Sequence, residues 1–463
     1  MRVVVIGAGV AGSSAGLAFA QDGHDVVVVD RTGAPPLTAS SADEVFDTWD
    51  RPGVGQFRQP HNFLGLGRTV LRDRFPSVYA AVVGAGAGEV NMASFLGDTP
   101  RLPGDEDLAT IACRRPVFDA ALREALVDRV EVRIADVTGL TVRAGAVAGV
   151  VLDGGETVAA DLVLDAAGRR THASDWLVAA GRSPFPAQSN DCGLLYYSRH
   201  YRVRDEEAMP AYASLLGGPR GDIGYLAFAT FLGDNRTFSL AVMVPVWDKD
   251  FRALRDAAAF DRVAWLLPGM AAWLTGAVPA SSVLPMGQLR NTVRRIVDHD
   301  RSVAPGLVPL GDALSHTNPT FAFGASLSLA QGARLADLAA AATDPSDLAV
   351  SFDAAIGADV RQRFRAVSAE DADRLRLWSG EPLDVTDRTQ SMALFLRFVV
   401  YRASAGDPDL LRAVARRINA LDPPDRLAED EELLDRGAAL YASLPPAAVP
   451  ARATLLTALS GGS

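Results

Sequence analysis

The residues of this chain best suited to chemistry form a glycine-rich loop close to its start. Gly7 allows a tight turn, Gly9 lets the backbone approach a pyrophosphate, and Gly12 lets a helix pack closely on a strand. The amides at the start of that helix, near Val10 and Ala11, would attract phosphate charge together with the helix dipole. The loop therefore predicts that the chain binds a dinucleotide.

An acidic residue supports the same interpretation. Asp30 ends the apolar run 26–29, at about the distance from the glycines expected of a carboxylate that binds an adenosine ribose. Small residues at such spacings also occur in ordinary turns, but here a β-branched run precedes the loop and a helical pattern follows it. The ligand predicted from these residues is FAD or NAD(P).

Three later segments offer further groups to such a ligand. Arg115 lies at the start of a helical pattern, where a solvated side chain or an ion pair is the ordinary role and a bound phosphate or flavin chain is the alternative. Asp165 and Asp312 each lie at the end of a short apolar strand pattern. Residues 318–325 open a long helix of small residues, and a helix start beyond a strand end suits an electron-rich ring or an oxyanion.

Arg58 and His61 are the candidates for a catalytic role. They lie in the segment 51–61, and a histidine that is simply hydrogen-bonded in a loop is an equally good interpretation of His61. Five aromatic residues are candidates for an apolar substrate pocket, with core packing as an equal alternative. They are Tyr196, Phe228, Phe231, Phe321 and Phe323.

The predicted elements would position these residues around a parallel sheet. Short β-branched runs predict strands that are buried on both faces. They lie at residues 2–6, 26–29, 161–165 and 307–310. Helical patterns follow the glycine loop and recur at 62–83 and 117–127.

A second sheet is predicted in the middle of the chain. Between residues 192 and 246 the strands become longer and rich in Tyr, Phe and Leu, with 233–235 as a hairpin turn. This pattern predicts an antiparallel sheet inserted into the nucleotide-binding fold. Residues 352–444 are mostly helical by pattern, and we expect the Pro- and Ala-rich tail after Ser443 to be mobile.

The predicted fold class is therefore α/β, with a Rossmann-like nucleotide-binding domain, an inserted antiparallel substrate sheet and a helical C-terminal region. Residues 1–183 and 296–345 are assigned to the first, 184–295 to the second, and 346–463 to the third.

Composition limits the classes of function. Among the 463 residues, 49% are hydrophobic and 22% charged, as in soluble globular proteins. The net charge of -11 argues against nucleic acid as a partner. The two cysteines, Cys113 and Cys192, and the six histidines have no metal-ligand spacing, so we expect no metal. No apolar run reaches the ~18 residues of a membrane span, and the chain passes from Met1 directly into a predicted strand, so we expect a cytoplasmic protein without membrane insertion.

These motifs together resemble the single-chain FAD-dependent monooxygenases of the aromatic-hydroxylase type. The resemblance rests on the glycine loop with Asp30, on Asp-Ala-Ala-Gly-Arg at 165–169, and on Gly311-Asp312 followed by the helix start at 319–325. The segments 51–61 and 165–169 look closer to the branch of squalene-epoxidase-like and polyether-epoxidase-like enzymes. The likeness covers most of residues 1–430.

The resemblance implies a role for each motif. The glycines and Asp30 would bind the ADP half of FAD, Arg115 its pyrophosphate or ribityl chain, and Asp312 the ribityl hydroxyls. Residues 319–325 would face the isoalloxazine ring, where amides stabilise negative charge on the reduced flavin. The full set of cofactor residues is Gly7, Gly9, Val10, Ala11, Gly12, Asp30, Arg31, Arg115, Val137, Asp165, Gly168, Gly311, Asp312, Pro319, Gly324 and Ala325.

Two departures from the family pattern bear on the reaction. Related aromatic hydroxylases have Asp-Gly where this chain has Asp-Ala-Ala-Gly at 165–168, and that segment serves both cofactors in the hydroxylases. The electron donor is therefore left open between NADPH or NADH and a separate flavin reductase. Many relatives have Gly-x-Gly where this chain has Gly324-Ala325-Ser326, and the added Cβ could alter ring placement or reactivity toward O2.

The leading hypothesis is a flavin monooxygenase that hydroxylates or epoxidises a largely apolar organic molecule with O2 as co-substrate, in specialised metabolism. The alternatives are an FAD-dependent reductase or dehydrogenase of a prenyl-like substrate and a non-catalytic flavin-binding protein. A flavin-dependent halogenase is less favoured, because the six tryptophans are isolated and form no Trp-x-Trp-x-Ile-Pro signature.

Overall fold

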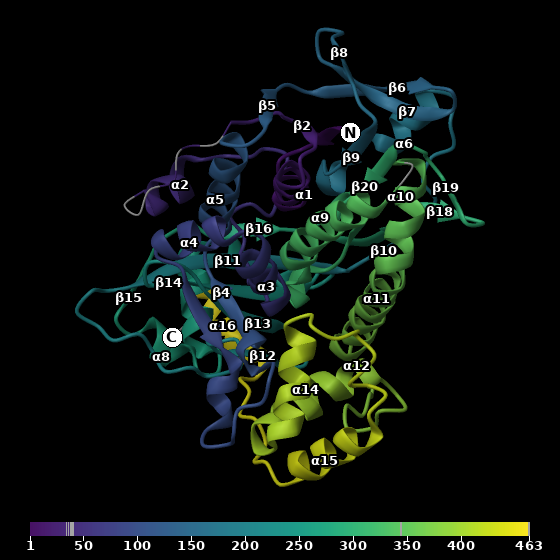
Figure 1. Ribbon diagram of the computed structural model, residues 1–463. Coiled ribbons are helices and arrows are strands. Elements are labelled where there is room, and N and C mark those ends of the chain that lie inside the picture. Colours follow the sequence, from purple (N-terminus) through teal and green to yellow (C-terminus); the bar gives the residue numbers. More distant parts are fainter. Residues whose placement is uncertain (34, 36, 38–40, 343–344, 462–463) are drawn as a thin grey trace.

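A five-stranded parallel sheet positions the first half of the candidate site (Figure 1). The computed structural model describes residues 1–33, 35, 37, 41–342 and 345–461. The strand order is β20-β9-β1-β2-β5, and every neighbouring pair is parallel. The strands are β1 (Arg2–Ile6), β2 (Asp25–Asp30), β5 (Glu131–Ile134), β9 (Leu162–Asp165) and β20 (Leu307–Pro309). The four predicted buried strands are confirmed.

Helices cover this sheet. They are α1 (Val10–Gln21), α2 (Ala42–Thr48), α3 (Gly65–Arg74), α4 (Pro76–Gly84), α5 (Arg115–Val127), α6 (Ala173–Ala179), α9 (Phe323–Ala341) and α10 (Pro345–Phe352). The helix predicted at 62–83 is in fact two, because the chain leaves helical geometry at Phe75 and Pro76 starts a new first turn.

Close packing of α1 on α9 brings two segments together that are far apart in the sequence. A Cβ at Gly332 would lie 2.6 Å from the Ala15 backbone nitrogen, so only glycine fits between the two helices. Because α1 begins at the glycine loop and α9 begins at the segment 319–325, this contact places both helix starts beside the same edge of the sheet.

Two small antiparallel sheets lie at the periphery of this domain. The first has the order β6-β7-β8 and contains β6 (Val137–Arg143), β7 (Ala146–Leu152) and β8 (Thr157–Ala159). The second pairs β3 (Gly88–Asn91) with β4 (Ala109–Ala112). The short strands β18 (Val297–Asp298) and β19 (Arg301–Ser302) form a hairpin.

The predicted antiparallel sheet has the order β12-β13-β14-β11-β15, with β16 also paired to β11. Its strands are β11 (Leu194–Val203), β12 (Arg220–Asp222), β13 (Ala227–Leu232), β14 (Thr237–Pro245), β15 (Ala277–Pro279) and β16 (Leu284–Met286). The hairpin predicted at 233–235 joins β13 to β14, and its residues Asn235 and Arg236 have left-handed φ angles of 49° and 62°.

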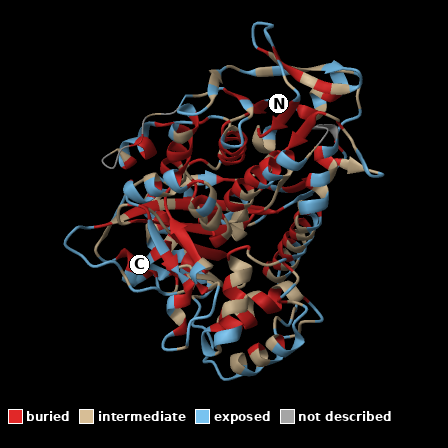
Figure 2. Cartoon of the chain, in the orientation of Figure 1, coloured by how far each residue is buried: buried red, intermediate tan, exposed pale blue. Residues whose placement is uncertain are grey.

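The two faces of this sheet have different partners. One face packs on α7 (Ala257–Leu266), α8 (Met270–Leu274) and α16 (Arg452–Ser460), and the other turns toward the parallel-sheet domain. A three-stranded sheet, β10-β17-β21, joins the two parts through β10 (Ala187–Asp191), β17 (Arg290–Arg294) and β21 (Ser315–His316). Figure 2 shows that the buried residues concentrate in the strands of both large sheets and in α1.

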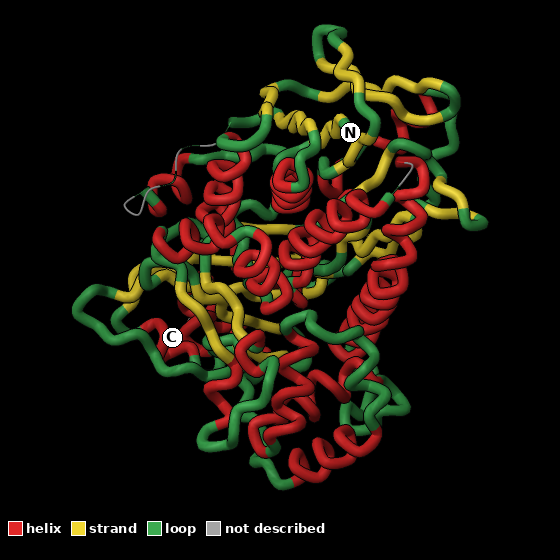
Figure 3. Tube along the Cα trace, in the orientation of Figure 1, coloured by secondary structure: helices red, strands yellow, loops and turns green. Residues whose placement is uncertain are grey.

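The C-terminal region is helical, as predicted, and its segment 392–442 lies at the lower edge of the molecule in Figures 1 and 3. Its helices are α11 (Ala358–Trp378), α12 (Met392–Phe395), α13 (Tyr401–Ala403), α14 (Pro408–Ile418) and α15 (Glu431–Ala442). The expectation of a mobile tail is wrong for α16, because Leu455 and Leu459 are buried against the antiparallel sheet and its helices. Among the described helices, none combines the length and apolar composition needed to cross a membrane.

Candidate functional site: a cavity between the two sheets

A cavity of about 1500 Å³ lies between the parallel sheet, the antiparallel sheet and the C-terminal helices. Ligand pockets in proteins commonly measure roughly 300–1,000 Å³, so this cavity has room for a dinucleotide and a second molecule. Its wall includes the ends of β1 and β2, the loop after β20, the start of α9 and the inner face of the antiparallel sheet.

The glycine loop forms one end of the cavity. Gly7 has a φ of +92°, and a Cβ there would lie 2.7 Å from the Ala166 carbonyl oxygen. A Cβ at Gly12 would lie 1.8 Å from the Gly7 carbonyl oxygen, so Gly12 permits the close packing of helix and strand. Gly9 lines the cavity with nothing within 4 Å of its Cβ position, which leaves space for a ligand. No side chain caps the first turn of α1, so its amides can receive an anion.

Asp30 lies at the cavity wall as a buried carboxylate with several donors. It accepts hydrogen bonds from the Ala8 amide at 2.7 Å, from the Thr32 amide and hydroxyl at 2.9 Å, and from Arg51 at 3.0 Å. Burial favours the neutral acid, but Arg51, the Ala8 amide and Arg123 outweigh it and hold the pKa of Asp30 below its ordinary value. Asp30 is therefore an ionised acceptor beside the glycine loop.

Arg51 is a site residue to which the sequence assigned no role. It lines the cavity and bridges Asp30 to the buried Asp119, at 3.1 Å, so one guanidinium organises two carboxylates. The sequence feature that pointed to Arg51 was its position in the segment 51–61. The partner of an arginine in a polar loop cannot be deduced from the neighbouring residues.

Other arginines make this end of the cavity electropositive. Arg115 borders it, and its Nε is buried without a hydrogen-bond partner among the described residues. Arg169 also lines the cavity, where burial lowers its pKa, with the guanidinium beside Gly55. Arg31 pairs with Asp136 at 3.2 Å. Arg115 also forms an ion pair with Asp119 at 3.5 Å, and a pyrophosphate would add negative charge beside these arginines.

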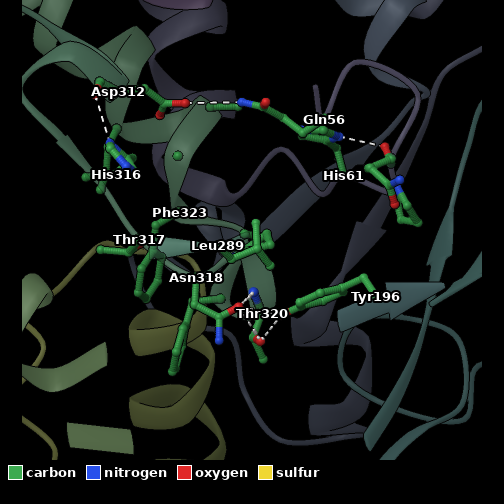
Figure 4. Close-up of a pocket in the computed structure, with 18 of the residues that line it drawn as sticks. Gln56, His61, Tyr196, Leu289, Asp312, His316, Thr317, Asn318, Thr320 and Phe323 are labelled. Atoms are coloured by element: carbon green, nitrogen blue, oxygen red, sulfur yellow. Dashed lines mark hydrogen bonds between the residues drawn. The ribbon is translucent and has the colours of Figure 1, made fainter. Parts of the chain in front are cut away.

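Asp312 faces the cavity from the loop after β20 (Figure 4). Its Oδ2 accepts a hydrogen bond from Gln56 Nε2 at 3.1 Å, and its carbonyl oxygen lies 3.1 Å from His316 Nδ1. The Gln56 Oε1 atom is buried and has no hydrogen-bond partner among the described residues. Gln56 is a second site residue that the sequence did not predict, because its partner Asp312 lies far from it in the sequence.

The segment before α9 forms the centre of the wall. A 3₁₀ turn at Pro319–Phe321 and a left-handed Ala322, with φ of 56°, precede the helix, so α9 begins at Phe323 rather than at 318. The Cβ position of Gly324 has only Asp312 Oδ1, at 3.8 Å, within 4 Å. The first turn of α9 has no side-chain cap, which leaves its amides available to a ring oxygen or nitrogen.

Tyr196 connects this segment to the antiparallel sheet. Its hydroxyl donates to Asn318 Oδ1 and lies 2.6 Å from Thr320 Oγ1 (Figure 4). Asn318 in turn donates to Asp371 of α11 at 2.5 Å. Burial raises the pKa of Tyr196, so the phenol stays protonated. The hydrogen bonds fix the sheet, the turn before α9 and α11 relative to one another.

His61 is placed in the cavity but is not available as an acid or base. Nε2 faces Arg115 Nη1 at 3.2 Å and Nδ1 faces the Gln59 carbonyl at 2.8 Å, so the partners assign the proton to Nδ1. Burial and the charge of Arg115 lower the pKa of His61 to about 3. The neutral ring therefore orients Arg115, which agrees with the simpler interpretation of this histidine.

Arg58 does not belong to the cavity wall, and its proposed catalytic role is not supported. Its guanidinium donates to the carbonyl oxygens of Phe46 and Trp49, both at 2.8 Å, at the end of α2. Arg58 thus stabilises the C-terminal end of a helix, where carbonyl groups lack partners.

The aromatic candidates divide between the cavity and the core. Tyr196 and Phe231 belong to the cavity-facing cluster of the sheet, whereas Phe228 packs in the core on the opposite face, although it reaches the cavity wall. Neighbouring residues of a strand point to opposite faces, which separates Phe228 from Phe231. Phe321 and Phe323 stack with ring centroids 5.5 Å apart and both line the cavity.

Most of the predicted cofactor residues meet at this cavity. Asp165 does not: its carboxylate is buried beneath the turn, where it accepts from Thr171 Oγ1 at 2.6 Å and the Ala167 amide at 3.1 Å, and burial raises its pKa. Gly12 also lies behind the wall. The others line the cavity, namely Gly7, Gly9, Val10, Ala11, Asp30, Arg31, Arg115, Val137, Gly168, Gly311, Asp312, Pro319, Gly324 and Ala325.

These features fit FAD. The open position at Gly9, the start of α1 and the Arg115 guanidinium suit a pyrophosphate, while Asp30 and Asp312 supply acceptors for ribose and ribityl hydroxyls. When bound, FAD would supply the hydride and dioxygen chemistry that protein side chains lack.

Parts of this sequence are similar to known proteins. Residues 2–44 match the family model described as FAD dependent oxidoreductase. Protein Rv3254 of Mycobacterium tuberculosis (strain ATCC 25618 / H37Rv) is 26% identical over 368 residues, which cover 72% of each chain.

Two solved structures show the same fold at low sequence identity. The flavin-dependent brominase Bmp2 is 18% identical, with a TM-score of 0.58 and coverage of 91% of this chain and 100% of that one. PqsL, described as a probable FAD-dependent monooxygenase from Pseudomonas aeruginosa, is 14% identical, with a TM-score of 0.60 and coverage of 85% and 99%. These structures show the fold that the chain shares, and the family match is confined to residues 2–44.

Proposed function

We propose that this protein is an FAD-dependent monooxygenase that places one oxygen atom from O2 in a largely apolar organic substrate, by hydroxylation or epoxidation. The observation that carries the proposal is that one cavity joins the dinucleotide-type end to the apolar inner face of the antiparallel sheet. A redox ring at the start of α9 would then lie beside a second molecule in the same enclosed space.

The apolar part of the wall favours a hydrocarbon-rich substrate. Ala227, Ala229 and Phe231 project from β13 and Met243 from β14 into one cluster that borders the cavity. Burial of apolar surface contributes about 25 cal/mol per Å², so such a wall can bind an organic molecule without many specific polar contacts.

The protein's own residues bind, orient and exclude water in this proposal. Asp30 and Asp312 orient the cofactor, and the amides at the start of α9 face its ring. The Gln56–Asp312 hydrogen bond joins the loop 51–61 to the segment after β20. Exclusion of water favours oxygen transfer to the substrate over loss of the activated oxygen.

Oxygen labelling tests the proposal directly. The FAD-loaded protein would be supplied with NADPH, NADH or a separate flavin reductase, under labelled dioxygen, with polyene and phenolic substrates. We expect a product with one labelled oxygen atom. Turnover that changes the substrate without label would indicate a reductase or dehydrogenase, and flavin binding without turnover would indicate a carrier.

Reactions with and without bromide distinguish oxygenation from halogenation. Because the fold is shared with a brominase, the same reactions should be run with and without bromide. We expect the oxygenated product in both. A product that contains bromine and forms only in the presence of the halide would contradict the proposal.

A further inference from the structure

Arg220 is a cation of the cavity wall that has no acidic partner among the described residues. It starts β12 and lines the cavity beside Phe231, whose ring centroid lies 5.8 Å from the guanidinium carbon. Its Nε donates to Ser214 Oγ at 3.2 Å and its Nη2 to the Thr230 carbonyl at 3.1 Å. Among the described residues, no carboxylate oxygen lies within 4.0 Å of the guanidinium, and Nη1 makes no hydrogen bond.

The nearby charges do not compensate Arg220. Burial lowers the pKa of Arg220 to about 10, and repulsion by the positive charge of Arg397 lowers it in the same direction. The acids of this region are engaged elsewhere. Glu370 accepts from Arg374 at 2.6 Å and from Arg397, while Asp222 accepts from Trp378 Nε1 at 2.8 Å. Arg220 therefore remains an uncompensated positive charge at neutral pH.

Two arginines at the opposite end of the cavity have acidic partners. Arg51 bridges Asp30 and Asp119, and Arg31 pairs with Asp136. A charge that is removed from water without a partner is unfavourable, so a partly buried, unpaired guanidinium in a ligand cavity indicates that a ligand supplies the partner.

We propose that the substrate carries a carboxylate, which binds Arg220, and that the apolar body of this acid lies along the inner face of the antiparallel sheet. This inference rests on the proposed function, because it assigns the apolar end of the cavity to the substrate. A planar carboxylate matches the fork of a guanidinium and supplies the negative charge that Arg220 lacks. The apolar residues Ala229, Phe231 and Met243 accommodate the rest of the molecule.

Equilibrium dialysis of the FAD-loaded protein against acids and their uncharged amides tests this inference. The probes are benzoate and benzamide, cinnamate and cinnamamide, and decanoate and decanamide. For at least one pair we expect the acid to bind about tenfold or more tightly than the amide, since the amide keeps the shape and loses the charge. Absence of any acid preference across the pairs, whether both bind equally or neither binds, would overturn the inference.

Variants then locate the preference. Arg220→Gln should reduce the acid-to-amide ratio to below about twofold, and Arg220→Lys should keep part of it. The matched control is Arg290→Gln, which removes the same charge from an exposed position of the cavity wall. A preference that disappears in the control and persists in Arg220→Gln would reject the assignment. If Arg220→Gln does not fold, the acid-to-amide binding ratios of the parent and of Arg220→Lys are compared instead. An unchanged ratio in Arg220→Lys would reject the assignment.

Dialysis needs no turnover, so the two proposals fail separately. A protein that prefers acids and incorporates no labelled oxygen would retain the carboxylate site and lose the monooxygenase proposal. A protein that oxygenates neutral compounds and shows no preference for acids would retain the monooxygenase proposal and lose the carboxylate site.

Discussion

Asp30 shows how one side chain can serve both the ligand site and the stability of the fold. It accepts from the glycine-loop amide of Ala8 and pairs with Arg51, while Arg123 lies 3.6 Å away. Removal of its carboxylate therefore has two consequences, one for the cofactor and one for two buried cations.

We expect Asp30→Ala to weaken FAD binding by about 1.5–3 kcal/mol, the value of a hydrogen bond to a charged group. The apo protein should also lose roughly 3–5 kcal/mol of unfolding free energy, because Arg51 and Arg123 lose a buried partner. FAD titration and urea unfolding measure the two effects. Asp25→Ala, at the exposed start of the same strand, is the control. An unchanged FAD dissociation constant would reject the ribose assignment.

At Asp312, the effect of a substitution on cofactor binding can be separated from its effect on the stability of the apo protein. Within the described part of the chain, its side chain has one hydrogen bond, to Gln56, so Asp312→Ala should leave the melting temperature of the apo protein close to that of the parent. The variant should purify largely colourless, because the ribityl contacts are lost. The flavin absorbance per protein measures this, with the exposed Asp98→Ala as control. Full flavin content in Asp312→Ala would show that the carboxylate faces something other than the cofactor.

His61 predicts a pH dependence of stability. Its pKa is about 3 in the folded protein and 6.5 ordinarily, so the unfolded chain takes up the proton first as the pH falls. The contribution of His61 is thus fully present above about pH 6.5 and decreases by up to ~1.4 kcal/mol per pH unit toward pH 3. His200, with a pKa of about 4, acts in the same direction.

Urea unfolding at several pH values would measure this effect. His61→Gln should lose less stability than the parent between neutral and mildly acidic pH, and the exposed His172→Gln is the control. Equal slopes in the parent and in His61→Gln would mean that His61 is solvated rather than buried neutral.

At the scale of elements, the contact between α1 and α9 sets the geometry of the site. It depends on Gly332, which leaves space for Ser14 and Ala15. This contact brings the two helix starts to one edge of the sheet, so a shift between the helices would move the amides at both ends of the cofactor.

We expect Gly332→Ala to lower the unfolding free energy by roughly 1–3 kcal/mol through overpacking, and to weaken FAD binding as well. The control is Gly84→Ala, at the end of α4, where nothing lies within 4 Å of the Cβ position. That change should be neutral or stabilising by up to about 1 kcal/mol. Thermal unfolding of both apo variants compares them. An unchanged unfolding free energy in Gly332→Ala would show that α1 and α9 can move apart without loss of stability.

At the scale of the whole molecule, the cavity is bounded by parts of the chain that only the fold brings together. The glycine loop, the loop 51–61, the segment after β20 and the antiparallel sheet all border it. A dinucleotide in this position would contact several of these parts and stabilise their arrangement.

Saturating FAD should therefore stabilise the protein by mass action. At a concentration 100 times the dissociation constant, we expect about 2.7 kcal/mol of added unfolding free energy. Thermal unfolding with FAD and with FMN, which lacks the adenosine half, measures this. The effect of FMN should be smaller, because Asp30 and the glycine loop have no partner in it. Equal stabilisation by FMN would contradict the placement of the adenosine.

Features that depend on neighbouring residues could be predicted from the sequence alone. The glycine loop, the carboxylate that ends β2 and the hairpin at 233–235 follow from backbone conformation and local spacing, and the structure contains all of them. Because strands of a parallel sheet end at one edge, the residues after β1, β2 and β20 could also be expected to meet.

Only the tertiary structure decided which side chains face the cavity. Arg58 turns to the end of α2, and Phe228 packs on the far face of its sheet, although both lie close in sequence to residues of the wall. Gln56 and Arg220 became site residues through contacts with segments that the sequence cannot bring together. Strand register and helix packing set these distances. The charge balance around a buried arginine depends on every element that packs against it, so it emerges only once the whole chain has folded.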